Sequence, residues 1–541
     1  MFAVTRAALA ATGLALMLGS AAHANAATSE SAGTDEVAQG RALFLEGKRA
    51  SGASLVAHRA GGLGVAGAQA ACVNCHRRSG LGGAEGRSYI PPITAESLFE
   101  AKAPGTGASA SGRGRPAYSD KSLARAIRSG IDPSGRRLDF LMPRYELQDA
   151  EVKSLVAYLR QLSDQPAPAR EAGGLNFATV VAPGMQPERS KAMTEVLQAC
   201  FNEHNAGAPP EHGRKRLGPN MSLREQPKWN LHIWELEGKP ETWDGQLSAH
   251  AQRQPVFALV GGLGAGQWAP VHEFCERSAL PCLFPHVEAP VAGATGFYPL
   301  YLSRGVLLEA DIIGQDLARG GAAKRVIQVL RADDEGARAG ADALRRSLAE
   351  RSIEEQELRI EAAAPLDART FDRAQAGDTV VLWLRADDLK RLDGVHRVPS
   401  QVYASATLAE TDAVPLPPAW KARTLIAFPF ELPQDRAARM APLHAWLQAH
   451  GIPLTAERIQ ADAYVACSAL AAGMNQAADH LHRDYLVERL EAIMERGTVT
   501  GLYPRLAIGA GQRFASKTGY LVRFEQPQSG RLLPVGERVA P

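Results

Sequence analysis

The motif Cys72-Val-Asn-Cys75-His76 constrains this chain more than any other feature of its sequence. Two thiols three positions apart can form thioether bonds to the two vinyl groups of a single haem, and the adjacent imidazole can then ligate the iron. The surrounding chain must therefore fold around a porphyrin. We predict one covalent haem c, bound through Cys72 and Cys75, with His76 as an axial ligand of the haem iron.

Two other interpretations of this motif fit the flanking sequence less well. A structural zinc site would need a second pair of ligands, and the region between residues 27 and 174 offers only His58 and no further cysteine. A thioredoxin-like redox pair would need a surrounding βαβ pattern, which this region lacks. The haem interpretation is therefore preferred.

A six-coordinate electron-transfer haem needs a second axial ligand, and a thioether sulfur raises the reduction potential. Between residues 27 and 174 the sequence has one methionine, Met142, which follows a glycine-rich turn and precedes Pro143. The proline fixes the backbone just after the sulfur-bearing side chain. We predict Met142 as the second iron ligand. The alternatives are that Met142 only fills the core and that His58 ligates the iron.

Residues 1–26 have the features of a secretory signal peptide. Arg6 supplies the positive start, residues 7–18 form the apolar run, and small residues precede the candidate cleavage sites near Ala24 or Ala26. We expect export to the periplasm. No later apolar run approaches the roughly 20 residues that cross a bilayer, so no membrane span is expected after cleavage. With a formal net charge of +2, the chain is not expected to bind nucleic acid.

The length of 541 residues predicts more than one domain. Short helices separated by glycine-rich loops predict a small all-α domain at residues 27–163. A polar, proline-marked stretch at residues 164–174 has the composition of a linker. From residue 175 to residue 541, apolar strands alternate with amphipathic helices, which indicates a parallel sheet and an α/β fold with two lobes.

Three further positions in the small domain extend the haem motif. Gly40 and Phe44 lie on a predicted N-terminal helix, and Tyr158 lies on the last helix before the linker. With the haem motif, this arrangement resembles a class I cytochrome c, from about Asp35 to Ser163. The resemblance implies that the two helices cross at Gly40, where the lack of a side chain lets them approach closely.

The larger half contains several segments that match a second family as a set. They are a glycine-rich turn at Gly261–Gly266, the segment Leu280–Pro285, the strand and helix that begin at Arg325, and a late helix at Ala463–Gly473. From about Leu175 to Glu525 the chain resembles a type I periplasmic solute-binding protein, the fold of the branched-chain amino-acid receptors of ABC transporters. The resemblance implies a two-lobed α/β domain that binds a small molecule.

The glycine-rich turn is a candidate ligand contact, because a strand end followed by a helix N-terminus exposes backbone N–H groups that suit an anion. A plain tight turn is the alternative. Amino-acid-binding members of the family have a serine or threonine near this place, whereas this chain has Ala265, which argues against an amino-acid ligand. The predicted cleft residues are Gly264, Ala265, Trp268, His286 and Tyr298, around an unidentified small molecule.

Four cysteines remain outside the haem motif. Cys275 ends a predicted helix and Cys282 starts the next strand, so a short loop disulfide between them is possible. Cys200 and Cys467 lie on predicted helices that the family resemblance places in one lobe, and they are either paired or simply buried.

No catalytic motif is found: the sequence has a single Cys-x-x-Cys-His and no nucleophile elbow, zinc-protease motif or P-loop. We therefore expect no enzyme. We predict a periplasmic monohaem cytochrome that transfers single electrons, fused to a solute-binding or partner-docking module, with a periplasmic dehydrogenase or another cytochrome as redox partner. Two alternatives are an ABC-transporter-type solute receptor with an accessory haem and a haem-based redox or gas sensor.

Overall fold

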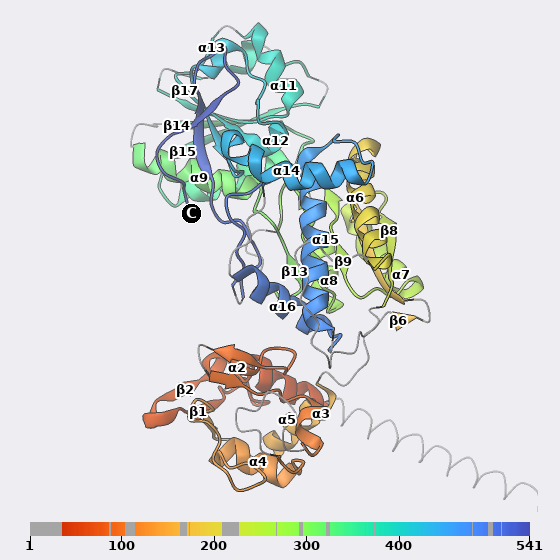
Figure 1. Cartoon of the computed structure of the whole chain (residues 1–541). Coiled ribbons are helices and arrows are strands. Elements are labelled where there is room, and N and C mark those ends of the chain that lie inside the picture. Colours follow the sequence, from red (N-terminus) through yellow and green to blue (C-terminus); the bar gives the residue numbers. More distant parts are fainter. Residues whose placement is uncertain are drawn as a thin grey trace, which may run out of the picture. The chain divides into compact units, whose positions relative to one another are not determined.

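The chain divides into two compact units, Met1–Pro166 and Ala167–Pro541, in a computed structural model (Figure 1). The predicted signal peptide and most of the predicted linker lie outside the described residues. None of the described helices combines the length and the apolar character that a bilayer span requires. The structure describes residues 35–85, 88–102, 114–162, 170–171, 174–207, 227–266, 268–291, 296–320, 325–362, 364–366, 368–371, 374–375, 377–395, 397–478, 480–495, 501–509 and 511–540.

The small unit is built mainly from helices, and its described part also contains short strands. A three-stranded antiparallel sheet has the order β2-β1-β5, and β3 pairs with β4. The expectation of an all-α domain is therefore corrected: strands of two to three residues pair with one another between the helices. The elements are a helix at residues 35–46, β1 (Val56–His58), η1 (Ala60–Gly62), β2 (Gly64–Ala66), η2 (Gly67–Ala70), α2 (Val73–His76), β3 (Gly83–Glu85), β4 (Ser88–Ile90), α3 (Ala95–Phe99), α4 (Asp120–Ser129), β5 (Arg144–Tyr145) and α5 (Asp149–Gln161).

The helix at residues 35–46 crosses α5 at Gly40, as the family resemblance implies. A Cβ atom added to Gly40 would lie 2.0 Å from the carbonyl oxygen of Ser154 and 2.8 Å from Cβ of Tyr158. One turn later, the rings of Phe44 and Tyr158 pack with their centroids 5.3 Å apart. Glycine is thus required for this close approach of two backbones.

We expect Gly40→Ala to destabilise the small unit by about 1–3 kcal/mol. The added methyl group would meet the backbone of α5, which cannot move aside as a flexible side chain would. Denaturant unfolding followed by haem absorbance measures the loss. Gly64→Ala is the matched control, since an added Cβ there meets nothing within 4 Å. Equal stability of the two variants would contradict this packing role.

The first lobe of the large unit is an eight-stranded sheet with helices on both faces. Its main order is β12-β10-β7-β9-β11-β13, with β8 and β6 also paired to β7. Phe177 of β7 faces a cluster with α6, whereas the next residue, Ala178, faces a cluster with α7 and α8. The elements are β6 (Arg170–Glu171), β7 (Gly174–Val181), α6 (Pro187–Asn205), β8 (Trp229–Glu235), η3 (Pro240–Thr242), α7 (Trp243–Arg253), β9 (Leu259–Val260), β10 (Leu263–Gly264), α8 (Ala269–Arg277), β11 (Cys282–Leu283), β12 (His286–Val287), β13 (Pro299–Leu300), α14 (Pro433–Ala449), α15 (Glu457–Ala477) and α16 (Arg483–Glu495).

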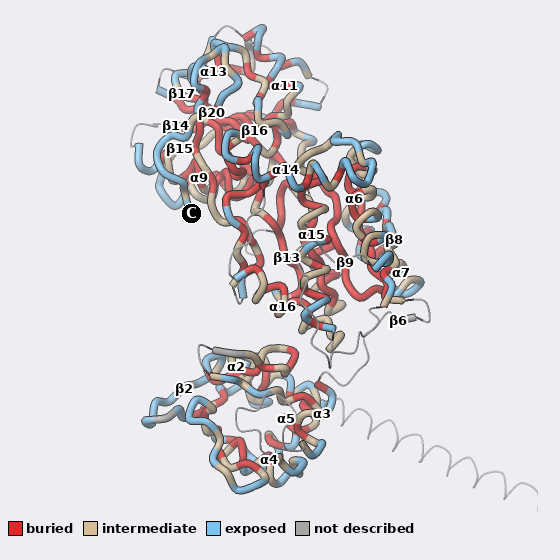
Figure 2. The backbone as a smooth tube through the Cα atoms, viewed as in Figure 1, coloured by how far each residue is buried: buried red, intermediate tan, exposed pale blue. Residues whose placement is uncertain are grey.

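The second lobe is a seven-stranded sheet with the order β15-β14-β16-β17-β18-β19-β20. Its first five strands are parallel, and β19 and β20 are antiparallel. The central strands β14, β16, β17 and β18 are buried for most of their length, and Figure 2 shows the interior of this lobe as buried tubes. The α/β prediction is therefore confirmed. The elements are α9 (Val306–Gly320), β14 (Arg325–Arg331), α10 (Glu335–Ala349), β15 (Glu354–Ile360), η4 (Ala368–Phe371), β16 (Thr379–Trp383), α11 (Ala386–Arg391), η5 (Leu392–Gly394), β17 (Gln401–Ser405), α12 (Ala406–Ala409), α13 (Pro418–Lys421), β18 (Thr424–Phe428), β19 (Tyr520–Phe524) and β20 (Leu532–Pro534).

Two disulfides join cysteines of the large unit. Cys275 is bonded to Cys282 across a short loop. Cys200 of α6 is bonded to Cys467 of α15, which lies 267 positions later in the sequence. The second disulfide therefore ties together two helices of the first lobe whose N-terminal turns both reach the space between the lobes.

We expect loss of the long-range disulfide, in a Cys200→Ser/Cys467→Ser variant, to cost the large unit about 2–4 kcal/mol of stability. The chain-entropy model attributes the loss to the larger freedom of the unfolded chain, and this freedom grows with loop length. In that model a Cys275→Ser/Cys282→Ser control loses less than half as much, because its loop spans only 7 positions. Denaturant unfolding followed by tryptophan fluorescence compares them, and equal losses would contradict the entropic account.

Candidate functional site

The haem motif occupies one tight helical turn. Cys72 is the N-cap of α2, and its carbonyl accepts a hydrogen bond from the backbone N–H of His76 at 3.0 Å. The next residue, Arg77, has a φ of 63°, so the chain turns sharply after the histidine. Neither Cys72 nor Cys75 is part of a disulfide, in contrast to the other four cysteines.

The side chain of His76 is held as a neutral imidazole. It is buried, and its Nδ1 lies 3.1 Å from the carbonyl oxygen of Pro91. Because a carbonyl only accepts, Nδ1 carries the proton and Nε2 keeps its lone pair. Burial lowers the pKa of His76 to about 4, although the contact with Pro91 acts in the opposite direction. This is the tautomer in which a histidine binds a metal through Nε2.

The loop with Met142 packs against the haem motif. Met142 is half-buried and contacts the same apolar cluster as Cys72 and Val73. Three residues later in this loop, Tyr145 hydrogen-bonds the thiol of Cys72. Burial, the largest effect, raises the pKa of that thiol to about 12. The backbone around Met142 is fixed by hydrogen bonds to Asp139 and Arg144.

The alternative ligand, His58, has a different environment. It lies at the exposed end of β1, and its Nε2 is 2.7 Å from Oε1 of the exposed Glu146. An imidazole engaged with a surface carboxylate is a poorer candidate than a thioether that packs against the same apolar cluster as Cys72. The donor set of two thiols, a neutral buried imidazole and a half-buried thioether fits a haem c.

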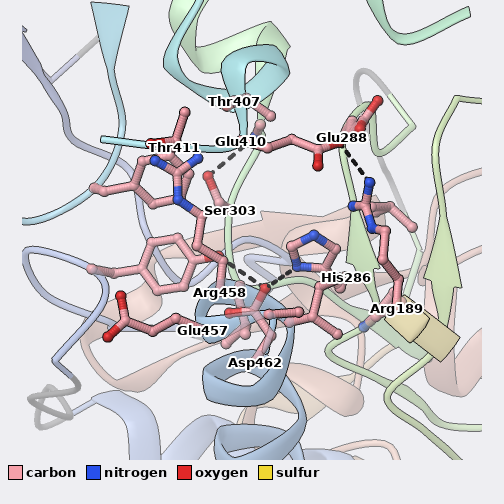
Figure 3. A pocket seen from close by; sticks show the side chains of 18 of the residues that line it. Arg189, His286, Glu288, Ser303, Thr407, Glu410, Thr411, Glu457, Arg458 and Asp462 are labelled. Carbon is pink, nitrogen blue, oxygen red and sulfur yellow. Dashed lines mark hydrogen bonds and ion pairs between the residues drawn. The ribbon is translucent and has the colours of Figure 1, made fainter. Parts of the chain in front are cut away.

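A second candidate site is a cleft of about 450 Å³ in the large unit (Figure 3). Both lobes contribute to it, through the first turn of α6, the region of β12, the segment after α12 and the first turns of α15. Its described lining consists of Gln186, Glu188, Arg189, Pro285, His286, Val287, Glu288, Leu302, Ser303, Gly305, Thr407, Glu410, Thr411, Asp412, Phe430, Thr455, Ala456, Glu457, Arg458, Ile459, Asp462 and Tyr503.

Ion pairs connect the two lobes beside this cleft. Arg189 of α6 contacts Glu410 at 2.5 Å, and Arg458 of α15 contacts Asp412 at 2.9 Å. Behind the cleft wall, Arg385 donates two hydrogen bonds to Glu288, of 2.6 and 2.8 Å.

Two of the carboxyl groups in these pairs, the buried Glu288 and the half-buried Asp412, differ in the direction of their pKa shifts. Burial raises the pKa of Glu288, and the hydrogen bonds from Arg385 only partly oppose this. Burial would also raise the pKa of Asp412, but Arg436 and Arg458 together hold that pKa below its usual value.

A second polar group lies on the floor of the cleft. Nδ1 of His286 is 2.6 Å from Oδ2 of Asp462, and the hydroxyl of Tyr503 donates to the same oxygen at 3.2 Å. Figure 3 shows His286 and Asp462 joined in this way, with Arg189 paired to Glu410 above them.

Of the five predicted cleft residues, His286 lies in this cleft and the others do not. Trp268 and Tyr298 lie outside its described lining and are buried in the core, so their placement in the cleft is corrected. The Tyr298 hydroxyl donates to Asp484 at 2.7 Å. Ala265 lines a separate open depression on the large unit.

The glycine-rich turn serves packing. Added Cβ atoms on Gly262 and Gly264 would lie 3.1 and 2.8 Å from ring carbons of Trp268, so these glycines make room for the indole. This favours the tight-turn alternative over anion binding.

The sequence analysis did not identify Arg189, Arg458 or Asp462 as cleft residues. Asp462 had a readable signal, because it interrupts the apolar run Ala461–Cys467 of a helix, where a carboxylate is rarely buried without a partner. Arg189 and Arg458 had no such signal in the sequence, because each pairs with a carboxylate from a distant part of the chain.

Comparisons with known proteins give a result for each unit. Residues 63–163 match the family model of cytochrome c. A branched-chain amino acid ABC transporter protein from Thermus thermophilus, solved with bound valine, aligns over 68% of this chain and 97% of its own, with 11% identity and a TM-score of 0.50. None of the curated proteins matches this chain in sequence.

Two further solved structures are similar to this chain. One is a fatty acid ABC transporter substrate-binding protein from Thermomonospora curvata, with 13% identity, coverages of 70% and 95% and a TM-score of 0.49. The other is a substrate-binding periplasmic protein from Ralstonia solanacearum, with 14% identity, coverages of 67% and 100% and a TM-score of 0.49. The chain therefore combines a cytochrome c domain at residues 63–163 with a second unit that has the fold of the type I periplasmic binding proteins of ABC transporters.

Proposed function

We propose that this protein is an exported electron carrier that transfers single electrons at one haem c and binds a small molecule in its larger unit. The proposed parts are a signal peptide at residues 1–26, the cytochrome domain at 27–163, a linker at 164–174 and the solute-binding domain at 175–541. The observation that carries the electron-transfer role is the buried, neutral His76, placed beside two cysteines that are outside disulfides.

Cys72 and Cys75 would hold the haem covalently, and His76 and Met142 would be its axial ligands. When bound, the haem supplies reversible one-electron chemistry. The protein's own part is to orient and shield it: Pro91 fixes the tautomer of His76, and the apolar cluster beneath Cys72 and Met142 excludes water.

The electron is proposed to pass to or from a second periplasmic protein, a dehydrogenase or another cytochrome. The inter-lobe cleft supports the solute-binding role, because it is a concave space of about 450 Å³ between two lobes, and small-molecule sites have this size and this position.

Counting haem in the exported chain tests the proposal. The full-length protein is produced in a bacterium that assembles c-type cytochromes, and haem is measured against polypeptide after denaturation. We expect one haem per chain, because thioether bonds survive unfolding and the sequence has one attachment motif. An exported chain without covalent haem would contradict it.

A further inference from the structure

The inter-lobe cleft has an unusual balance of charge. Its described lining carries six carboxylates, which are Glu188, Glu288, Glu410, Asp412, Glu457 and Asp462, against two arginines. Both arginines already have partners within the protein. Arg189 pairs with Glu410 at 2.5 Å, and Arg458 pairs with Asp412 at 2.9 Å and stacks on the ring of Phe430. A ligand carboxylate would have to displace one of these internal partners.

Four of the carboxylates lie within ion-pair distance of an arginine. Glu410 and Asp412 contact the arginines just named. Glu288 receives two hydrogen bonds from Arg385, and Glu457 lies 3.5 Å from a guanidinium nitrogen of Arg436. The fifth, Glu188, is exposed and can be hydrated.

Asp462 differs from all of these. It is 3% exposed, and the described contacts of its carboxylate are with His286 and Tyr503, both through Oδ2. The other oxygen, Oδ1, is buried without a hydrogen-bond partner. A buried carboxylate oxygen left unpaired costs free energy, and a charged donor recovers more of this cost than a neutral one.

Apolar side chains also line the cleft. Pro285, Val287, Leu302, Phe430 and Ile459 line the same cleft. The cavity of about 450 Å³ lies in the usual range for small-molecule sites. A ligand with a cationic head and a short apolar body would match both features.

We propose that the cleft binds a small primary amine as its ammonium form, with the ammonium group at Asp462 and the apolar body against Phe430 and Ile459. This inference rests on the proposed solute-binding function of the large unit. It excludes small carboxylates as preferred ligands, because their charge would meet the carboxylate of Asp462, whose described partners include no arginine or lysine.

Titration calorimetry on the full haem-loaded chain at pH 7, with n-butylamine, butyrate and 1-butanol, tests this inference. The three probes share one apolar body and differ in the charge of the head. We expect n-butylamine to bind at least about tenfold more tightly than 1-butanol, and butyrate not to bind. This comparison uses the unaltered chain, so it does not depend on any variant folding.

The variant Asp462→Asn keeps the shape of the side chain and removes its charge. We expect it to bind n-butylamine at least about tenfold more weakly, whereas Glu241→Gln, an exposed carboxylate outside the described lining, keeps the affinity of the unaltered chain. Amine binding that Asp462→Asn does not weaken would overturn the inference. Preferred binding of butyrate would overturn the amine inference but leave the proposed solute-binding function intact. If none of the three probes binds, both the amine inference and the proposed solute-binding function are overturned.

Discussion

Replacing Cys75 by Ala is expected to abolish stable haem attachment or to leave a single weakened link. The haem c assignment needs two thiols to reach the two vinyl groups of one porphyrin, and Cys72 and Cys75 are the cysteines outside disulfides. The covalent haem that remains after denaturation should therefore fall far below one per chain. Mass spectrometry of the denatured chain, together with a haem stain, measures this loss.

A matched control removes cysteines from the other unit. Cys275→Ser/Cys282→Ser breaks a disulfide of the large unit and leaves the haem motif unchanged. We expect this control to keep one covalent haem. If Cys75→Ala still carried haem with two thioether links, the assignment of the motif as a haem attachment site would be wrong.

Replacing Met142 by Ala is expected to lower the haem midpoint potential and to open the iron to added ligands such as imidazole. A thioether ligand raises the potential, so its loss should lower it by on the order of 100 mV. Potentiometry and the absorption spectra of both redox states measure the change. The neighbouring Leu141 is 42% exposed, and Leu141→Ala serves as control because it alters the same loop without removing the sulfur.

Unchanged spectra in Met142→Ala would show that this residue only fills the core. His58 would then become the leading candidate for the second ligand, and its contact with Glu146 would have to break for it to serve. A His58→Ala variant would separate the two cases, because it should alter the spectra only if the imidazole ligates the iron.

The haem motif could be read from sequence because thioether attachment needs its residues next to one another along the chain. The helix crossing at Gly40 could also be predicted, because the resemblance to class I cytochromes c implies it, and the structure places Gly40 and Phe44 against Tyr158 as expected. The short strands of the small unit could not, because β1, β2 and β5 have only two or three residues each. Alternation of apolar and polar residues cannot be recognised over so short a length.

Most residues of the cleft could not be predicted from the sequence, for a different reason. Arg189 and Glu410 are 221 positions apart, and His286 and Asp462 are 176 positions apart, so no local pattern connects them. Trp268 was misplaced because an aromatic residue after a glycine-rich turn is equally compatible with a ligand contact and with core packing. Gly262 and Gly264 lie against its ring, which shows that Trp268 is a packing residue. This position of the glycines is visible only in the folded structure.

We propose that this chain performs one-electron transfer at a single haem ligated by His76 and Met142. Spectroelectrochemical titration of the purified, full-length protein tests it most directly. We expect one reversible transition with a one-electron slope, in which the ratio of oxidised to reduced haem changes tenfold for about every 59 mV. We also expect a low-spin, six-coordinate iron in both redox states. Two transitions, or an iron with an open coordination site in the unaltered chain, would contradict it.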